Sequence, residues 1–204
     1  MNGNFRVAAF AGALAILATL PAIAQQQNVV RIRGTIERVE GGNCVVKARD
    51  GTEFKLAIAA KPQIAGVVKA SLDDIKPGSF VGVTAMPQSD GGLRALEVHI
   101  FPESMRGTGE GHYPWDLRPQ STMTNANVEQ VVTAVDGRTL SLKYKDGEKK
   151  ILVPADAPIV TYMPGDTSDI KAGAKVFIVA VKKSDGMLEG RAWRVGRDGV
   201  TPPM

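Results

Sequence analysis

Residues 74–85, DIKPGSFVGVTA, recur 95 positions further along the chain as residues 169–180, DIKAGAKVFIVA. The match extends outward from this stretch over residues 34–101 and 130–196, at an offset of 96 that falls to 95 after one deletion. Eighteen identities fall within some 60 aligned positions, where ordinary residue usage gives roughly four by chance. The sequence therefore predicts two copies of one structural unit.

Each copy has the pattern of a series of short strands. Residues 32–39 alternate apolar and polar side chains, as a half-buried strand does. Asp-Gly pairs at 50–51 and 146–147 predict tight hairpin turns, because Gly adopts the positive φ that such turns need. Residues 71–78 and 167–173 predict a capped turn or a single helical turn closed by Gly. The expected strands are 32–39, 43–48, 54–58, 81–86 and 93–101 in copy one, and 140–145, 150–153, 176–181 and 188–195 in copy two.

Five short strands with one helical turn between the third and the fourth predict a small closed barrel, similar to the oligonucleotide/oligosaccharide-binding (OB) barrel. Closure is expected because a flat sheet of five strands would expose its edges and one apolar face. The predicted fold class is all-β, with tandem OB-like barrels at residues 28–101 and 127–198 and a Gly/Pro-rich connection at 102–126. Because units this small bury modest cores, we expect the two copies to pack together or to share the segment between them.

The first 24 residues have the features of a secretory signal peptide. Arg6 gives a weakly positive start, residues 7–20 are almost wholly apolar, and Ala22-Ile23-Ala24 is a small-x-small cleavage site. The apolar run is shorter than the roughly 20 residues of a membrane-spanning helix, and no later segment is apolar enough to span a bilayer. We expect a periplasmic protein that begins at Gln25, with a retained N-terminal membrane anchor as the alternative.

Composition excludes several classes of protein. The chain has 25 Lys+Arg against 21 Asp+Glu and only 5% aromatic residues, which is weak support for a polyanion partner or a base-stacking surface. We therefore expect no nucleic-acid partner. The one Cys cannot form an internal disulfide or a Cys-based zinc site, and its alignment with Leu140 predicts that Cys44 faces the core. No nucleophile-elbow, zinc-protease or Cys–His signature is present, so the sequence gives no reason to expect an enzyme.

The connection at residues 102–126, PESMRGTGEGHYPWDLRPQSTMTNA, is the most informative segment for function. Its Gly and Pro residues predict that neither helix nor strand runs through it. A connection this long is typically functional, and its Trp, His, Tyr and Met residues differ from the Gly and Ser of flexible linkers. We expect a non-enzymatic binding module that contacts another envelope protein or an extended ligand across a barrel face or the groove between the barrels. The candidate binding residues are Arg106, Glu110, His112, Trp115 and Asp116.

Two of these candidates have alternative roles. Trp115 either fills the seam between the barrels or lies exposed as a platform for a ligand. Arg106 could pair with Glu103, Glu110 or Asp116 and so fix the loop.

A metal site is the alternative function. Imidazole and carboxylate groups could bind Zn(II) or Cu(II), and the candidate ligands are His99, His112, Glu103 and Glu110. Their spacing matches no compact metal motif. The competing interpretation places His99 on the outward surface of the last strand of copy one, with Val98 and Ile100 facing inward, and His112 in a hydrogen bond within an ordered loop.

The connection also carries a resemblance to a known family. VHIFPESMRGTGEGH at 98–112, Trp115-Asp116, and STMTNA at 121–126 resemble the exported bacterial proteins of domain-of-unknown-function family 5666, common in alphaproteobacteria. The similarity covers essentially the whole mature chain, although Tyr113 stands where members often carry a basic residue. It implies a fold and a compartment, and no activity. Members are sometimes labelled metal ABC transporter permeases, which this chain does not fit, because a permease needs several spanning helices.

Overall fold

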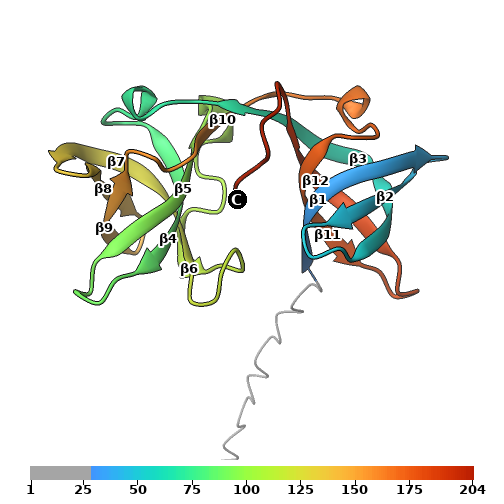
Figure 1. Cartoon of the computed structure of the whole chain (residues 1–204), viewed down its shortest axis with the longest axis horizontal. Helices are drawn as coiled ribbons and strands as arrows, with labels where there is room; N and C mark the ends of the chain where they lie inside the picture. Colours follow the sequence, from blue (N-terminus) through green and yellow to red (C-terminus); the bar gives the residue numbers. More distant parts are fainter. Residues whose placement is uncertain (1–28) are drawn as a thin grey trace, which may run out of the picture.

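The computed structural model describes residues 29–204 and shows an almost entirely β protein, as the sequence predicts (Figure 1). The expected signal peptide lies outside the described residues. Three one-turn 3-10 helices and no α-helix occur in residues 29–204, and nowhere in this range is a helix long and apolar enough to cross a membrane. The strands are β1 (Val29–Glu40), β2 (Asn43–Ala48), β3 (Glu53–Lys69), β4 (Phe80–Pro87), β5 (Leu93–Phe101), β6 (Gly111–Pro114), β7 (Thr122–Ala134), β8 (Gly137–Tyr144), β9 (Gly147–Pro154), β10 (Ile159–Pro164), β11 (Lys175–Lys182) and β12 (Leu188–Gly196).

The first barrel combines strands from both copies of the repeat. β1 pairs with β2 and β2 with β3, all from copy one. The circuit is closed by β11 and β12 of copy two, since β12 pairs with β3 in parallel and β11 pairs with both β12 and β1. These five strands form the barrel on the right of Figure 1.

The second barrel also combines strands from both copies, in the opposite way. β7, β8 and β9 of copy two pair in sequence. β4 and β5 of copy one complete it, because β4 pairs with β7 and with β5, while β5 reaches β9 through a short parallel pairing. The two copies therefore exchange their last two strands, which differs from the expectation of one barrel for residues 28–101 and another for 127–198.

The length of β3 explains the exchange. The sequence predicted a strand that ends near residue 58, but β3 continues to Lys69 as one strand of 17 residues, which is about 55 Å long at the usual rise. It begins in the first barrel and runs across the top of the molecule (Figure 1). The chain therefore reaches the second barrel before β4 and β5 begin.

A central pairing joins the two barrels. The second half of β3 pairs with β10, and β10 also pairs with β5 in parallel. Each barrel has its own apolar core, and a third core between them contains residues from both copies. This inter-barrel core consists of Ala65, Val67, Phe80, Phe101, Val160, Tyr162, Phe177 and Met204. The expectation that the barrels pack together is thus met by a continuous β-sheet as well as by apolar contact.

Several local predictions can be compared with the structure. Single 3-10 turns form at Leu72–Asp74 and Thr167–Asp169, where the sequence indicated a capped turn or helical turn. Cys44 is buried in the core of the first barrel, and burial raises the pKa of its thiol to about 11.

The prediction that no strand occurs within residues 102–126 is wrong. β6 forms there beside β7, and β7 itself begins at Thr122.

Candidate functional site

The connecting segment, here residues 102–121 between β5 and β7, binds to both barrels. At its start, the Arg106 guanidinium makes two hydrogen bonds to the Glu103 carboxylate, at 2.7 and 2.6 Å. The same guanidinium donates to Asn127 Oδ1 at 2.5 Å and to the Gly78 carbonyl at 3.0 Å. Arg106 thus fixes the loop through Glu103, one of the three partners that the sequence suggested.

The middle of the segment contacts the second barrel. Glu110 Oε1 accepts a hydrogen bond from the Lys145 amide at 3.0 Å. His112 Nδ1 lies 2.8 Å from Thr124 Oγ1, and its ring stacks near Tyr144 with the centroids 6.5 Å apart. Burial, and to a lesser extent the charge of Lys149, lowers the pKa of His112 below its ordinary value. The lowered pKa favours the neutral imidazole, whose unprotonated ring nitrogen can accept a hydrogen bond from the Thr124 hydroxyl.

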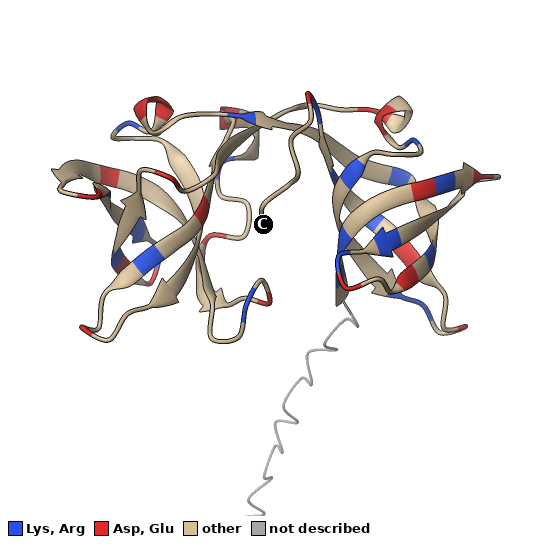
Figure 2. Ribbon diagram, in the orientation of Figure 1, with Lys and Arg blue, Asp and Glu red and all other residues tan. Residues whose placement is uncertain are grey.

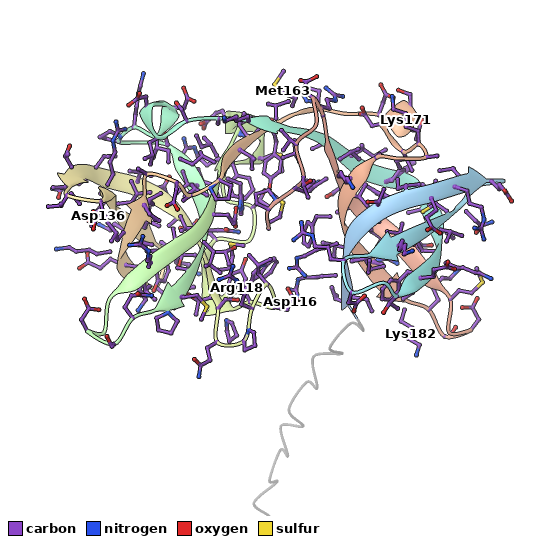
Figure 3. The ribbon with its side chains drawn as sticks, in the orientation of Figure 1. Asp116, Arg118, Asp136, Met163, Lys171 and Lys182 are labelled. Carbon is purple, nitrogen blue, oxygen red and sulfur yellow. The ribbon has the colours of Figure 1, made fainter. Side chains whose placement is uncertain are left out.

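The end of the segment contacts the first barrel. The Trp115 ring packs against the inter-barrel core, with the Arg31 guanidinium 4.3 Å from its centroid. The Asp116 carboxylate accepts a 2.6 Å hydrogen bond from Arg33 and lies 3.7 Å from Arg31. Figure 3 labels Asp116 between the two barrels. Of the two roles expected for Trp115, this position fits the filling of the seam.

The structure does not bring the candidate metal ligands together. His112 pairs with Thr124 in the β6–β7 register, and Thr124 pairs with Val83 of β4. His99 instead pairs with Gly82, the neighbour of Val83. Successive residues of a strand point to opposite faces, so the two imidazoles lie on opposite sides of one sheet. Within residues 29–204, no three His, Cys, Asp or Glu side chains gather in a group that could hold a metal ion.

His99 occupies a different environment from the exposed strand surface that the sequence suggested. Val98 and Ile100 face the core of the second barrel, as expected, so His99 points away from that core. It is nevertheless only 3% exposed. Its ring packs against Phe101 and Tyr162, with centroid distances of 4.9 and 5.7 Å. The inter-barrel core covers the outer face of β5. Because this core contains residues of both copies, the sequence of one copy does not predict it.

A buried polar cluster surrounds His99. Its Nδ1 lies 3.1 Å from the carboxylate of Glu97, which is completely buried and also accepts a hydrogen bond from the Thr84 hydroxyl. Asn125 donates to the Thr108 carbonyl at 3.0 Å and to the Tyr113 hydroxyl at 3.2 Å. Glu97 thereby links β5 to β4, and Asn125 links the connecting segment to β7. Glu97 and Asn125 have no signal in the sequence, because neither differs locally from a surface polar residue.

Gly82 lies directly beneath this cluster. A Cβ at this position would lie 2.5 Å from Asn125 Oδ1 and would also collide with the His99 ring. We therefore expect Gly82→Ala to lower the free energy of unfolding by about 1–3 kcal/mol, the usual cost of overpacking a closed core. Urea denaturation would measure it, with Gly92→Ala in an exposed turn as the control. Equal stability of both variants would contradict the close packing over Gly82.

Different residues lie over the equivalent outer faces of the two barrels. Register and bulge positions make Thr35 of β1 equivalent to Asn127 of β7, an offset of 92, whereas the sequence offset of 96 aligned Thr35 with Val131. In the second barrel, Asn127 accepts a hydrogen bond from Arg106. Arg106 is the fifth residue after the end of β5. The fifth residue after the end of β12, the equivalent strand of the first barrel, is Thr201. A surface cavity of about 470 Å³ lies beside Thr201. The cavity is lined by Gly34, Thr35, Glu37, Lys47, Ala48, Arg49, Gly51, Lys175 and Thr201.

Comparison with known proteins gives no further assignment, because no family model, no curated protein and no solved structure matches the chain. The fold defines the class of an all-β protein with strand-exchanged barrels. The connecting segment contacts both barrels, and the cavity beside Thr35 on the first barrel is the candidate binding site.

Proposed function

We propose that the protein is an exported, non-enzymatic binding module of the bacterial envelope, related to family 5666, and that it binds its partner or ligand on the outer face of the first barrel. One observation carries the proposal. The two equivalent barrel faces differ, because Arg106 covers that of the second barrel whereas a cavity remains open on the first. Its volume lies within the range usual for ligand sites, about 300–1,000 Å³, as do those of other cavities on the first barrel, so the choice depends on the difference between the two faces.

The contacts of the connecting segment support this choice of surface. Each of the five candidate binding residues already has a partner within the protein. A ligand that used these side chains would first have to break these contacts, which for Trp115 and Asp116 reach the first barrel and for the other three the second. The open face of the first barrel requires no such rearrangement.

A photo-crosslinking experiment tests the proposal. p-Benzoylphenylalanine placed at position 35, in the cavity, is expected to give a discrete adduct on illumination in envelope extract. The same group placed at position 141, on the outer face of β8, serves as the control and is expected to give none. Absence of an adduct from position 35, or equal adducts from both positions, would contradict binding at this face.

A further inference from the structure

The strand register places several cations around the same cavity. Thr35 of β1 has Lys47 of β2 on one side and Lys175 of β11 on the other. Arg49 follows Lys47 by two residues, so it emerges on the same face, and its amide donates to the Arg33 carbonyl. Side chains on adjacent strands at the same register lie close together. Three cationic side chains, those of Lys47, Arg49 and Lys175, therefore line one cavity, on a barrel whose strands carry many of the basic positions in Figure 2.

Within residues 29–204, none of Lys47, Arg49 and Lys175 forms an ion pair with a carboxylate. Arg49 donates to the Pro202 carbonyl at 2.7 Å, and Lys175 Nζ lies 3.1 Å from the Thr35 hydroxyl. Both groups keep further N–H donors, because a guanidinium has five and an ammonium three. Glu37 also lines the cavity but forms no ion pair within residues 29–204.

Arg49 is the most constrained of the three cations. Burial, and secondly the nearby charge of Arg33, lowers the pKa of its guanidinium below the ordinary value. The charged form of Arg49 is therefore destabilised when no ligand is bound. A negative group in the cavity would offset both the lost hydration and the repulsion from Arg33.

The second barrel provides an internal comparison. Lys143, the equivalent of Lys47, forms an ion pair with Glu129 at 3.2 Å. Phe80, buried in the inter-barrel core, takes the place of Lys175. The second barrel thus has an apolar residue and a paired lysine where the first barrel has two unpaired lysines. Two unpaired lysines therefore occur on the face that carries the cavity, whereas the additional cation on the equivalent face, Arg106, is paired with Glu103.

We propose that the cavity binds an oxyanion, such as a phosphate or carboxylate group, through Lys47, Arg49 and Lys175. The inference rests on the proposed function and adds the chemical class of the ligand. Arg49 and the two lysines surround a common space from which the anion can accept several charge-assisted hydrogen bonds. The Thr35 hydroxyl lies between the two lysines and can donate another.

Amide NMR of the purified protein, titrated with inorganic phosphate, tests the inference. We expect saturable shifts at Lys47, Arg49 and Lys175 that weaken as NaCl is raised. Lys47→Gln combined with Lys175→Gln should weaken binding at least tenfold, whereas Lys143→Gln should leave it unchanged. A second arm with phosphatidylglycerol vesicles, against phosphatidylcholine vesicles, distinguishes a lipid headgroup from the free ion. Saturable binding in either arm with this variant pattern supports the oxyanion site.

Three results would overturn the inference. These are no saturable response to phosphate or to phosphatidylglycerol, retention of binding by the double lysine variant, and an equal loss with Lys143→Gln. The crosslinking experiment tests the proposed function independently of anion binding. An adduct at position 35 without anion binding would remove the oxyanion and leave the binding face. Absence of that adduct together with no saturable response to phosphate or phosphatidylglycerol would remove the proposed function itself.

Discussion

Trp193→Ala is expected to destabilise the protein by about 3–5 kcal/mol, the usual cost of removing a fully buried aromatic side chain. Trp193 is completely buried, and its indole N–H donates to the Gly190 carbonyl at 3.0 Å. It belongs to copy two, but its core includes Ile32, Cys44 and Leu56 of copy one. The cavity left by the substitution should therefore loosen strands that lie more than a hundred residues earlier in the chain.

Two measurements check this expectation. Urea denaturation gives the loss of stability, with Trp115→Ala as the control, because Trp115 is only partly buried and should cost less. Amide hydrogen exchange then locates the loss. Faster exchange is expected in β1 and β2 of copy one, beyond any change in β7 and β8 of copy two. Faster exchange confined to β7–β9 would mean that Trp193 belongs to a barrel made by its own copy.

The sequence was sufficient to predict the fold class and most of the strands. Alternation in residues 32–39 and the Asp-Gly turn at 50–51 are local signals, and β1, β2 and the hairpins form as expected. The exchange of strands has no local signal. β4 and β11 have the same pattern, so either could close either barrel. The choice depends on β3, which continues as an extended strand through Pro62.

The candidate site was predicted less completely, for related reasons. The Trp, His, Tyr and Met content indicated an ordered connection at residues 102–126, but the Gly and Pro residues wrongly indicated that it holds no strand, since β6 and the start of β7 lie there. Arg106 pairs with Glu103, one of the partners suggested. The roles of Lys47 and Lys175 depend on a register between β1, β2 and β11, which come from different copies. His99 was expected on a surface because the inter-barrel core that buries it is formed by both copies.

Separation of the two copies is the second change for which a large effect is expected. Residues 122–204 contain β7–β9 but not β4 and β5, and they contain β11 and β12 but not β1–β3. Neither barrel can close, and an open set of short strands leaves its edges and apolar face exposed. We expect this fragment to have no folded monomeric state. Residues 25–118 lack the complementary strands and should behave in the same way.

Circular dichroism of the fragment 122–204, heated alone and with an equimolar amount of 25–118, tests the strand exchange most directly. The exchange predicts no cooperative transition for the monomeric fragment alone. It predicts a single cooperative transition for the mixture, because the two fragments together restore the pairings of β1 with β11, β3 with β12, and β4 with β7. A monomeric fragment that unfolds cooperatively by itself, with the same midpoint after mixing, would show that each copy forms its own barrel and would contradict the exchange.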